Sequence, residues 1–357
     1  NETIGSRIPG FTRNPYATNR VPAGSSGGTG AAVAASFGVV GLGTDTGNSI
    51  RGPSSHNALV GIRSTIGLTS RDGIVPLAFS HDIGGPMART VADAVAVFDV
   101  LAGTDPADPT TLEADSRRAV DYNQFLDANV LATARIGVVR QIVDRESGDP
   151  RMRDLLSRAL EDLRVAGAQI VDPVIIPMLD ETVQFSCRRF RYDINAYLAT
   201  LGPDAPVKTL TEIVESGGYD RTVRDRLRRG LEESLEDPDS RCAEQTGNRR
   251  LLAQQVRGVL ADEQLDALVY PTWANVPRLI GDLRSPGGDN SQVLSPQTGF
   301  PAITVPMGWI EEGGQQLPAG LQIFGDAWSE PRLIAIAYAY EQATQHRRSP
   351  GTTPALR

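Results

Sequence analysis

The stretch Pro22–Ser55, PAGSSGGTGAAVAASFGVVGLGTDTGNSIRGPSS, carries two glycine-rich turns that each hold serine, at residues 24–28 and at residues 46–49. Between the turns, small residues at 29–36 predict a helix, and the apolar run at 39–44 predicts a short strand. Glycine is needed where the backbone takes positive φ or comes very close to another group. Two such turns flanking one strand therefore indicate a constructed site. The stretch contains no histidine, which argues against a Ser-His-Asp relay.

Two compound motifs in this stretch resemble the amidase signature family of hydrolases. The family patterns GGSSGG and G-x-D-x-G-x-S-[IV]-R-x-P stand here as AGSSGG at 23–28 and GTDTGNSIRGP at 43–53. The two family serines fall at Ser25 and Ser49, which are separated by the family's spacing of 24 positions. Further segments that resemble family motifs extend the similarity over roughly two-thirds of the chain; they lie at residues 61–68, 82–89, 266–272, 299–306 and 317–325.

The resemblance implies an α/β fold, in which one amidase domain spans residues 1–357 and a central mixed β-sheet is covered by helices on both faces. The predicted elements agree with a helix-covered sheet. A strand at 136–139, a helix that Asp149-Pro150 begins and Gly167 ends, and a strand at 169–176 form a βαβ-like unit with parallel pairing. Residues 179–262 are polar, arginine-rich and helical in pattern. In the family, this region caps the pocket and selects the substrate.

The family's Ser–cis-Ser–Lys triad assigns a role to each serine. Ser49 would attack the amide and form an acyl-enzyme, since amide hydrolysis needs an activated nucleophile. Ser25, after a cis Gly24-Ser25 bond, would relay protons, and we expect its hydroxyl about 2.6–3.2 Å from that of Ser49. The backbone N–H groups of residues Thr46, Gly47, Asn48 and Ser49 would form the oxyanion hole.

Three neighbouring side chains are expected to support these turns rather than to react. Ser26 would hold the first turn by hydrogen bonds, and Asp45 and Arg51 would lock the second, because buried charges are paired. Asn48 stands where the family usually has glycine. Asparagine tolerates the left-handed backbone better than other non-glycine residues, so we expect the turn to survive with a narrower pocket beside Ser49.

The base of the triad is the missing part of the pattern. Lys208 is the only lysine of the chain and lies outside every recognised motif, in the cap-like region. Arginine cannot replace it, because the guanidinium stays protonated near neutral pH. In the family, the catalytic lysine lies several dozen residues upstream of the first serine turn. We therefore predict that the domain is incomplete at its N-terminus and that the base comes from upstream of Asn1.

Composition narrows the class of protein further. The net charge of −8, without a basic cluster, argues against a nucleic-acid partner, and no apolar run is long enough to suggest a membrane partner. Cys187 and Cys242 lack the spacing of a metal site or a disulfide framework. These features predict a cytoplasmic protein with no metal and no cofactor, whose partner is a small-molecule amide. A homodimer is among the assemblies that the sequence allows.

Two other functions compete with the hydrolase. The Gly24–Gly30 loop could cradle an anion or a nucleotide, although it lacks the lysine of a G-x-x-x-x-G-K-[ST] loop and the GxGxxG pattern. A catalytically silent relative is the other alternative, because the lysine is missing. The substrate itself, whether an amide, an anilide, a carbamate or an ester, cannot be read, since the resemblance is weakest in the region that selects it.

Overall fold

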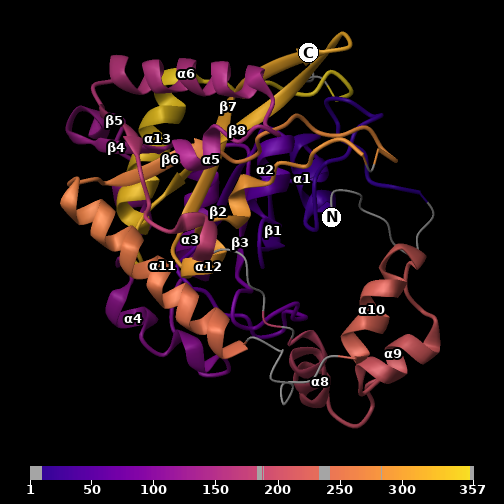
Figure 1. The fold of residues 1–357 in the computed structure, drawn as a ribbon. Helices are drawn as coiled ribbons and strands as arrows, with labels where there is room; N and C mark the ends of the chain where they lie inside the picture. Colours follow the sequence, from indigo (N-terminus) through magenta and orange to yellow (C-terminus); the bar gives the residue numbers. More distant parts are fainter. Residues whose placement is uncertain (1–9, 183–186, 188, 233–241, 283, 354–357) are drawn as a thin grey trace.

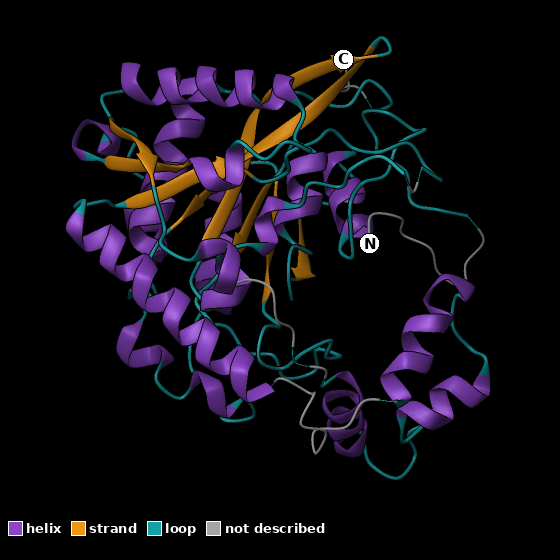
Figure 2. Ribbon diagram, in the orientation of Figure 1, coloured by secondary structure: helices purple, strands orange, loops and turns teal. Residues whose placement is uncertain are grey.

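The computed structural model describes residues 10–182, 187, 189–232, 242–282 and 284–353 (Figure 1). Within this part of the chain, one mixed sheet has the strand order β1-β3-β2-β7-β8-β6-β4-β5. Its strands are β1 (Val40–Thr44), β2 (Val60–Arg63), β3 (Gly84–Ala88), β4 (Arg135–Val139), β5 (Gln169–Val174), β6 (Ala267–Pro271), β7 (Ala302–Glu312) and β8 (Gln315–Phe324). Helices lie on both faces of this sheet (Figure 2), so the predicted α/β fold is confirmed.

The α-helices of the described residues follow the same order of layers along the chain. They are α1 (Gly27–Ala34), α2 (Arg51–His56), α3 (Val91–Leu101), α4 (Ala114–Arg117), α5 (Arg140–Val143), α6 (Pro150–Val165), α7 (Leu179–Thr182), α8 (Phe190–Thr200), α9 (Leu210–Ser216), α10 (Arg224–Leu231), α11 (Cys242–Asp262), α12 (Ser295–Thr298) and α13 (Glu330–Thr344). The predicted βαβ unit is confirmed, because β4 and β5 pair in parallel on either side of α6 in the sequence. Asp149 caps α6 by accepting the Arg151 N–H at 2.9 Å.

The two faces of the sheet differ in polarity. The face toward α3, α6 and α13 holds the main apolar core, which includes Ile62, Ile303 and Ile323 on three neighbouring strands. The opposite face packs against α2, where a Cβ at Gly61 would lie only 2.3 Å from Ser54 Oγ. Glycine is therefore required for α2 to approach the sheet this closely. Since α2 begins two residues after Ser49, this contact fixes the second serine turn against the sheet.

Helices α8, α9 and α10 lie to one side of the sheet-containing body (Figure 1). They enclose a small apolar cluster of their own around Ile194, Leu198 and Leu210. One link to the body is the Phe79 N–H, which donates to Asp193 Oδ2 at 3.0 Å. Within the described residues, no helix is both long and apolar enough to cross a membrane.

The two cysteines form a disulfide, so the prediction from their spacing was wrong. Cys187 precedes α8 and Cys242 begins α11, and 55 positions of sequence separate them. Spacing could not reveal the pair, because a disulfide depends on how close the two Cα atoms lie in space, here 4.5 Å. The bond joins the two ends of the segment that contains α8, α9 and α10.

Candidate active site

The two serine turns lie side by side at the start of two helices. The first turn contains a cis Gly24-Ser25 bond, as predicted, and leads into α1. The second connects β1 to α2. The Ser26 N–H donates to the Ser49 carbonyl oxygen at 3.2 Å and joins the turns directly. Ser25 is exposed and Ser49 is half-buried, so both hydroxyls can be reached from solvent.

The Ser49 hydroxyl donates to Asn48 Oδ1 at 3.3 Å. Among the hydrogen bonds of the described residues, none joins the hydroxyls of Ser25 and Ser49, so the predicted contact between them is not formed in this state. Asn48 also lies outside the left-handed region of backbone space. The turn therefore does not need the conformational tolerance that the sequence suggested for asparagine, and the Asn48 side chain instead contacts the proposed nucleophile.

Four consecutive N–H groups of the second turn, those of Thr46, Gly47, Asn48 and Ser49, have no acceptor within the described part of the chain. The next two N–H groups, of Ile50 and Arg51, do have one, because they donate to Asp45 Oδ2 at 3.2 and 3.4 Å. Backbone N–H groups in folded proteins are nearly always paired, with the protein, water or a ligand. A run of four free donors beside Ser49 is chemically suited to an oxygen that carries negative charge.

A buried ion cluster fixes the second turn from below. Asp45 is fully buried and accepts from Arg51 Nε at 3.0 Å and from Arg63 Nη1 at 3.1 Å. Burial by itself would raise the pKa of Asp45, but the two guanidinium groups hold it below its ordinary value. Burial lowers the pKa of Arg63 to about 10, which still leaves it charged at neutral pH.

Arg51 extends this cluster to segments far away in the sequence. Its Nη2 donates to the Gly47 carbonyl oxygen at 2.7 Å, which orients one peptide of the second turn. Its Nη1 donates to the Ser291 carbonyl oxygen at 2.7 Å and to Gln322 Oε1 at 3.0 Å. Sequence reasoning identified Asp45 and Arg51 but missed Ser291 and Gln322, because no local signal connects them with the serine motifs.

The remaining contacts of the two turns go to β1 and to the segment before β3. The Ser26 hydroxyl accepts from the Thr44 N–H at 3.2 Å and donates to the Thr44 carbonyl oxygen at 3.3 Å. The Thr46 hydroxyl donates to the Asp82 carboxylate. Burial raises the pKa of Asp82 although it accepts several hydrogen bonds. Asp82 is the acidic residue of the DIGGPMAR segment at 82–89, which could be recognised from the sequence only as a motif.

Lys208 serves a different part of the molecule. Its Nζ donates to the carbonyl oxygens of Gly202 and Pro203, both at 2.6 Å, in the loop between α8 and α9. The ammonium group therefore stabilises its own loop. In the described residues, no group of three His, Cys, Asp or Glu side chains could hold a metal ion.

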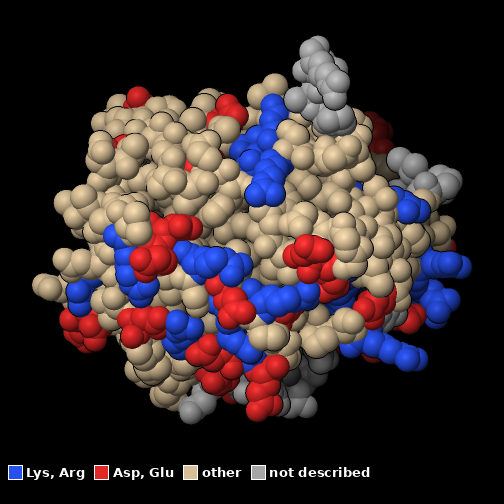
Figure 3. All heavy atoms as spheres, turned by 90° about the horizontal axis from the view of Figure 1, so that it is seen from above, with Lys and Arg blue, Asp and Glu red and all other residues tan. Residues whose placement is uncertain are grey.

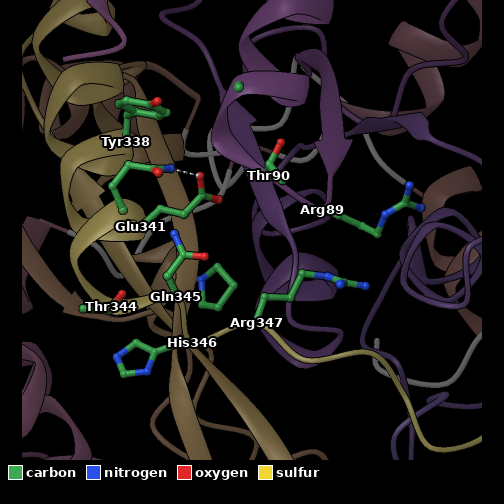
Figure 4. Close-up of a pocket in the computed structure, with 11 residues that line it drawn as sticks. Arg89, Thr90, Tyr338, Glu341, Thr344, Gln345, His346 and Arg347 are labelled. Carbon is green, nitrogen blue, oxygen red and sulfur yellow. Dashed lines mark hydrogen bonds between the residues drawn. The ribbon is translucent and has the colours of Figure 1, made fainter. Parts of the chain in front are cut away.

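A cavity of about 400 Å³ lies away from the serine turns, between α13 and the start of α3 (Figure 4). Glu341 lines it and accepts the Val91 N–H at 2.9 Å, at the first residue of α3. Burial is the main cause that raises the pKa of Glu341 to about 7, and Asp93 on α3 adds to it. The folded protein therefore holds a proton here that the unfolded chain loses at a lower pH.

We expect Glu341→Gln to stabilise the protein at pH 8 by about 1–2 kcal/mol, and to change little at pH 4. The folded-state pKa is raised, so the wild-type group costs stability as the pH rises from about 4.5 to 7, whereas glutamine stays neutral. Denaturant unfolding at both pH values measures the difference. Glu244→Gln on α11, where the side chain is exposed, is the matched control, and an equal gain in both variants would contradict the prediction.

Comparisons with known proteins agree on one family. The amidase family model matches residues 3–334. The glutamyl-tRNA(Gln) amidotransferase subunit of Gloeothece citriformis is 33% identical over 370 residues, covering 95% of this chain and 71% of that protein. The native peptide amidase of Stenotrophomonas maltophilia, a solved structure, has a TM-score of 0.83 and 39% identity, covering 96% of this chain and 70% of that one.

A second solved structure, the glutamyl-tRNA(Gln) amidotransferase subunit of Thermotoga maritima, has a TM-score of 0.73 and 29% identity, and the match covers 92% of this chain and 68% of that one. These two solved proteins have different named activities, yet this chain shares its fold with both. The chain therefore belongs to the amidase signature family and is an amidohydrolase.

Proposed function

We propose that this protein hydrolyses the C–N bond of a small or medium amide through an acyl-enzyme on Ser49. The observation that carries the proposal is the run of four N–H donors at residues 46–49, which have no acceptor within the described chain and lie beside the exposed hydroxyl of Ser25. Such donors stabilise the oxyanion that develops when an amide carbonyl is attacked. One donor of this kind is typically worth about 2.7–4 kcal/mol in the transition state.

The proposed reaction has two balanced steps. Ser49 Oγ bonds to the carbonyl carbon, its proton passes through Ser25 to the leaving nitrogen, and the C–N bond breaks. Water then attacks the ester of Ser49, the C–O bond to Ser49 breaks, and the proton returns to Ser49 as the acid leaves. Asp45, Arg51 and Ser26 act by holding the two turns together, because their hydrogen bonds end on those turns.

An amide is the substrate class that the relatives favour. The peptide amidase shares 39% identity with this chain, and the two amidotransferase subunits share 33% and 29%. We infer a hydrolase that acts on a free amide, and a role within an amidotransferase complex is the alternative. The region at 179–262 would select the substrate, and an anilide, a carbamate or an ester remains within the same chemistry.

A fluorophosphonate probe tests the proposal directly, since it bonds covalently to an activated serine. We expect mass spectrometry to find the probe on Ser49. Labelling confined to other residues, or none at all, would favour the silent relative or the anion-binding loop at Gly24–Gly30.

The base is proposed to be a lysine that lies upstream of Asn1, since Lys208 is held within the cap-like region. Burial can lower the pKa of a lysine by up to about 3–5 units, enough to make it a base near neutral pH. Protein limited to residues 1–357 is therefore expected to show little or no amide turnover, measured as ammonia release. Full activity that is lost in Lys208→Ala would show instead that Lys208 is the base.

The surface and the disulfide bear on partners and location. Seen from above (Figure 3), basic and acidic side chains form one mixed band. Ion pairs such as that of Arg151 with Asp149 and Glu312 are of this kind, and a nucleic-acid surface would need clustered basic residues. Disulfides persist mainly in oxidising compartments, so the Cys187–Cys242 bond weighs against the predicted cytoplasmic location. Alkylation of free thiols in intact cells would decide between the two.

A further inference from the structure

The loop at 289–292 is a part of the site that the serine motifs do not include. Its backbone is anchored at the end of β6, because the N–H groups of Asn290 and Ser291 donate to the Thr272 carbonyl oxygen at 3.1 and 3.2 Å. It is anchored again by Arg51 Nη1, which donates to the Ser291 carbonyl oxygen at 2.7 Å. The same arginine orients the Gly47 peptide. The loop and the second serine turn therefore form one rigid unit.

Gln292 projects from this loop over the second serine turn. Its Cγ and Oε1 each lie 3.4 Å from the position that a Cβ would take on Gly47. The side chain is exposed, whereas the neighbouring Ser291 is buried. Within the described residues, Oε1 receives no hydrogen bond. An amide oxygen that is free and faces solvent beside the four N–H donors is available to a bound molecule.

The orientation of the Gln292 amide is fixed by Asp289. Gln292 Nε2 donates to Asp289 Oδ2 at 2.5 Å, and the other carboxylate oxygen accepts from the Ser291 N–H at 3.1 Å. A carboxylate only accepts hydrogen bonds, so the NH₂ group must face Asp289 and the oxygen must face away from it. Burial raises the pKa of Asp289 to about 6, so the carboxylate is ionised at pH 8. The acceptor Oε1 is thus held ready without a change of rotamer.

We propose that Gln292 is a substrate-binding residue whose Oε1 accepts an N–H of the substrate, so that the site prefers carboxamides to esters. This inference rests on the proposed function at Ser49, because that function places the substrate beside Gly47. Donor and acceptor are complementary here: the N–H groups of residues 46–49 receive the substrate's carbonyl oxygen, and Gln292 receives its N–H. An ester of the same acyl group lacks the N–H and leaves Oε1 without that partner.

Binding of benzamide and of methyl benzoate to the 357-residue chain at pH 8, followed by NMR titration, tests the inference without requiring the base. Since one hydrogen bond of this kind changes a dissociation constant by about 2- to 10-fold, wild type should bind benzamide more tightly by that factor. Gln292→Met, which keeps the length but removes the acceptor, should abolish the preference. Asp289→Asn should reduce it in part, because the amide can then turn over. Gln124→Met, at another exposed glutamine, should leave it unchanged.

Two results would overturn the inference: no preference for benzamide in wild type, or equal weakening of both ligands by Gln292→Met. The fluorophosphonate experiment separates this from a failure of the proposed function. If Ser49 is labelled and Gln292→Met leaves the preference intact, only the role of Gln292 is wrong. If the preference depends on Gln292 and Ser49 is not labelled, only the catalytic proposal is wrong.

Discussion

Ser49→Ala is expected to abolish amide turnover, with a loss of about 10⁴-fold or more in kcat, because the oxygen that bonds to the carbonyl carbon is removed. The folded state should survive. The hydroxyl makes only the 3.3 Å bond to Asn48 within the described chain, and the free energy of unfolding should change by no more than about 0.5 kcal/mol. Turnover is measured as ammonia release from protein that carries its lysine, and stability by denaturant unfolding.

Ser26→Ala is the matched control for this experiment. It removes a hydroxyl from the neighbouring turn whose bonds go to the Thr44 backbone, so it should lower activity much less than Ser49→Ala. If Ser49→Ala lost its fold together with its activity, the serine would be structural. If Ser26→Ala were the more damaging of the two, the assignment of the nucleophile would have to be reconsidered.

The second large effect is expected for Asp45→Asn, which should destabilise the fold by about 3–5 kcal/mol, since it leaves Arg51 and Arg63 buried without a counter-charge. Both guanidinium groups are fully buried, so water cannot take the place of the carboxylate. Denaturant unfolding at pH 7 measures the loss. Asp72→Asn, at an exposed residue, should change stability little.

The pH dependence of that difference follows from the pKa of Asp45. Because the folded-state pKa lies below the ordinary value of 3.8, the stabilisation by the carboxylate is fully present above that value. It is lost as the pH falls through the folded-state pKa. The gap between wild type and Asp45→Asn should therefore narrow only in strong acid. A gap that closes already near pH 6 would mean that the ion cluster does not stabilise the fold.

Much of the fold and the centre of the site could be predicted from the sequence, because the information is local. The cap of α6 at Asp149, the parallel pairing of β4 and β5, and the cis bond before Ser25 lie in short segments with recognisable patterns. Asp45 and Arg51 were identified for the same reason, since they stand within six positions of each other in one motif.

The parts that escaped prediction depend on segments that meet only in the folded chain. Arg63 completes the ion cluster from β2, and Gln322 reaches Arg51 from β8, 271 positions away. The hydroxyl of Ser49 is turned to Asn48 because the side chain at that position, absent from the family pattern, provides an acceptor at once. The cysteines were misjudged on the same grounds, since spacing carries no measure of distance in space.

The disulfide has a consequence for how such an enzyme can change over generations. Cys187 and Cys242 bring the entry and the exit of the intervening segment to one point, with their Cα atoms 4.5 Å apart. A replacement of any length between them would meet the sheet at the same two anchor positions, with the register of the strands unaltered. The segment between the cysteines can thus diverge or be exchanged as a cassette, while the frame that carries the serines is inherited intact.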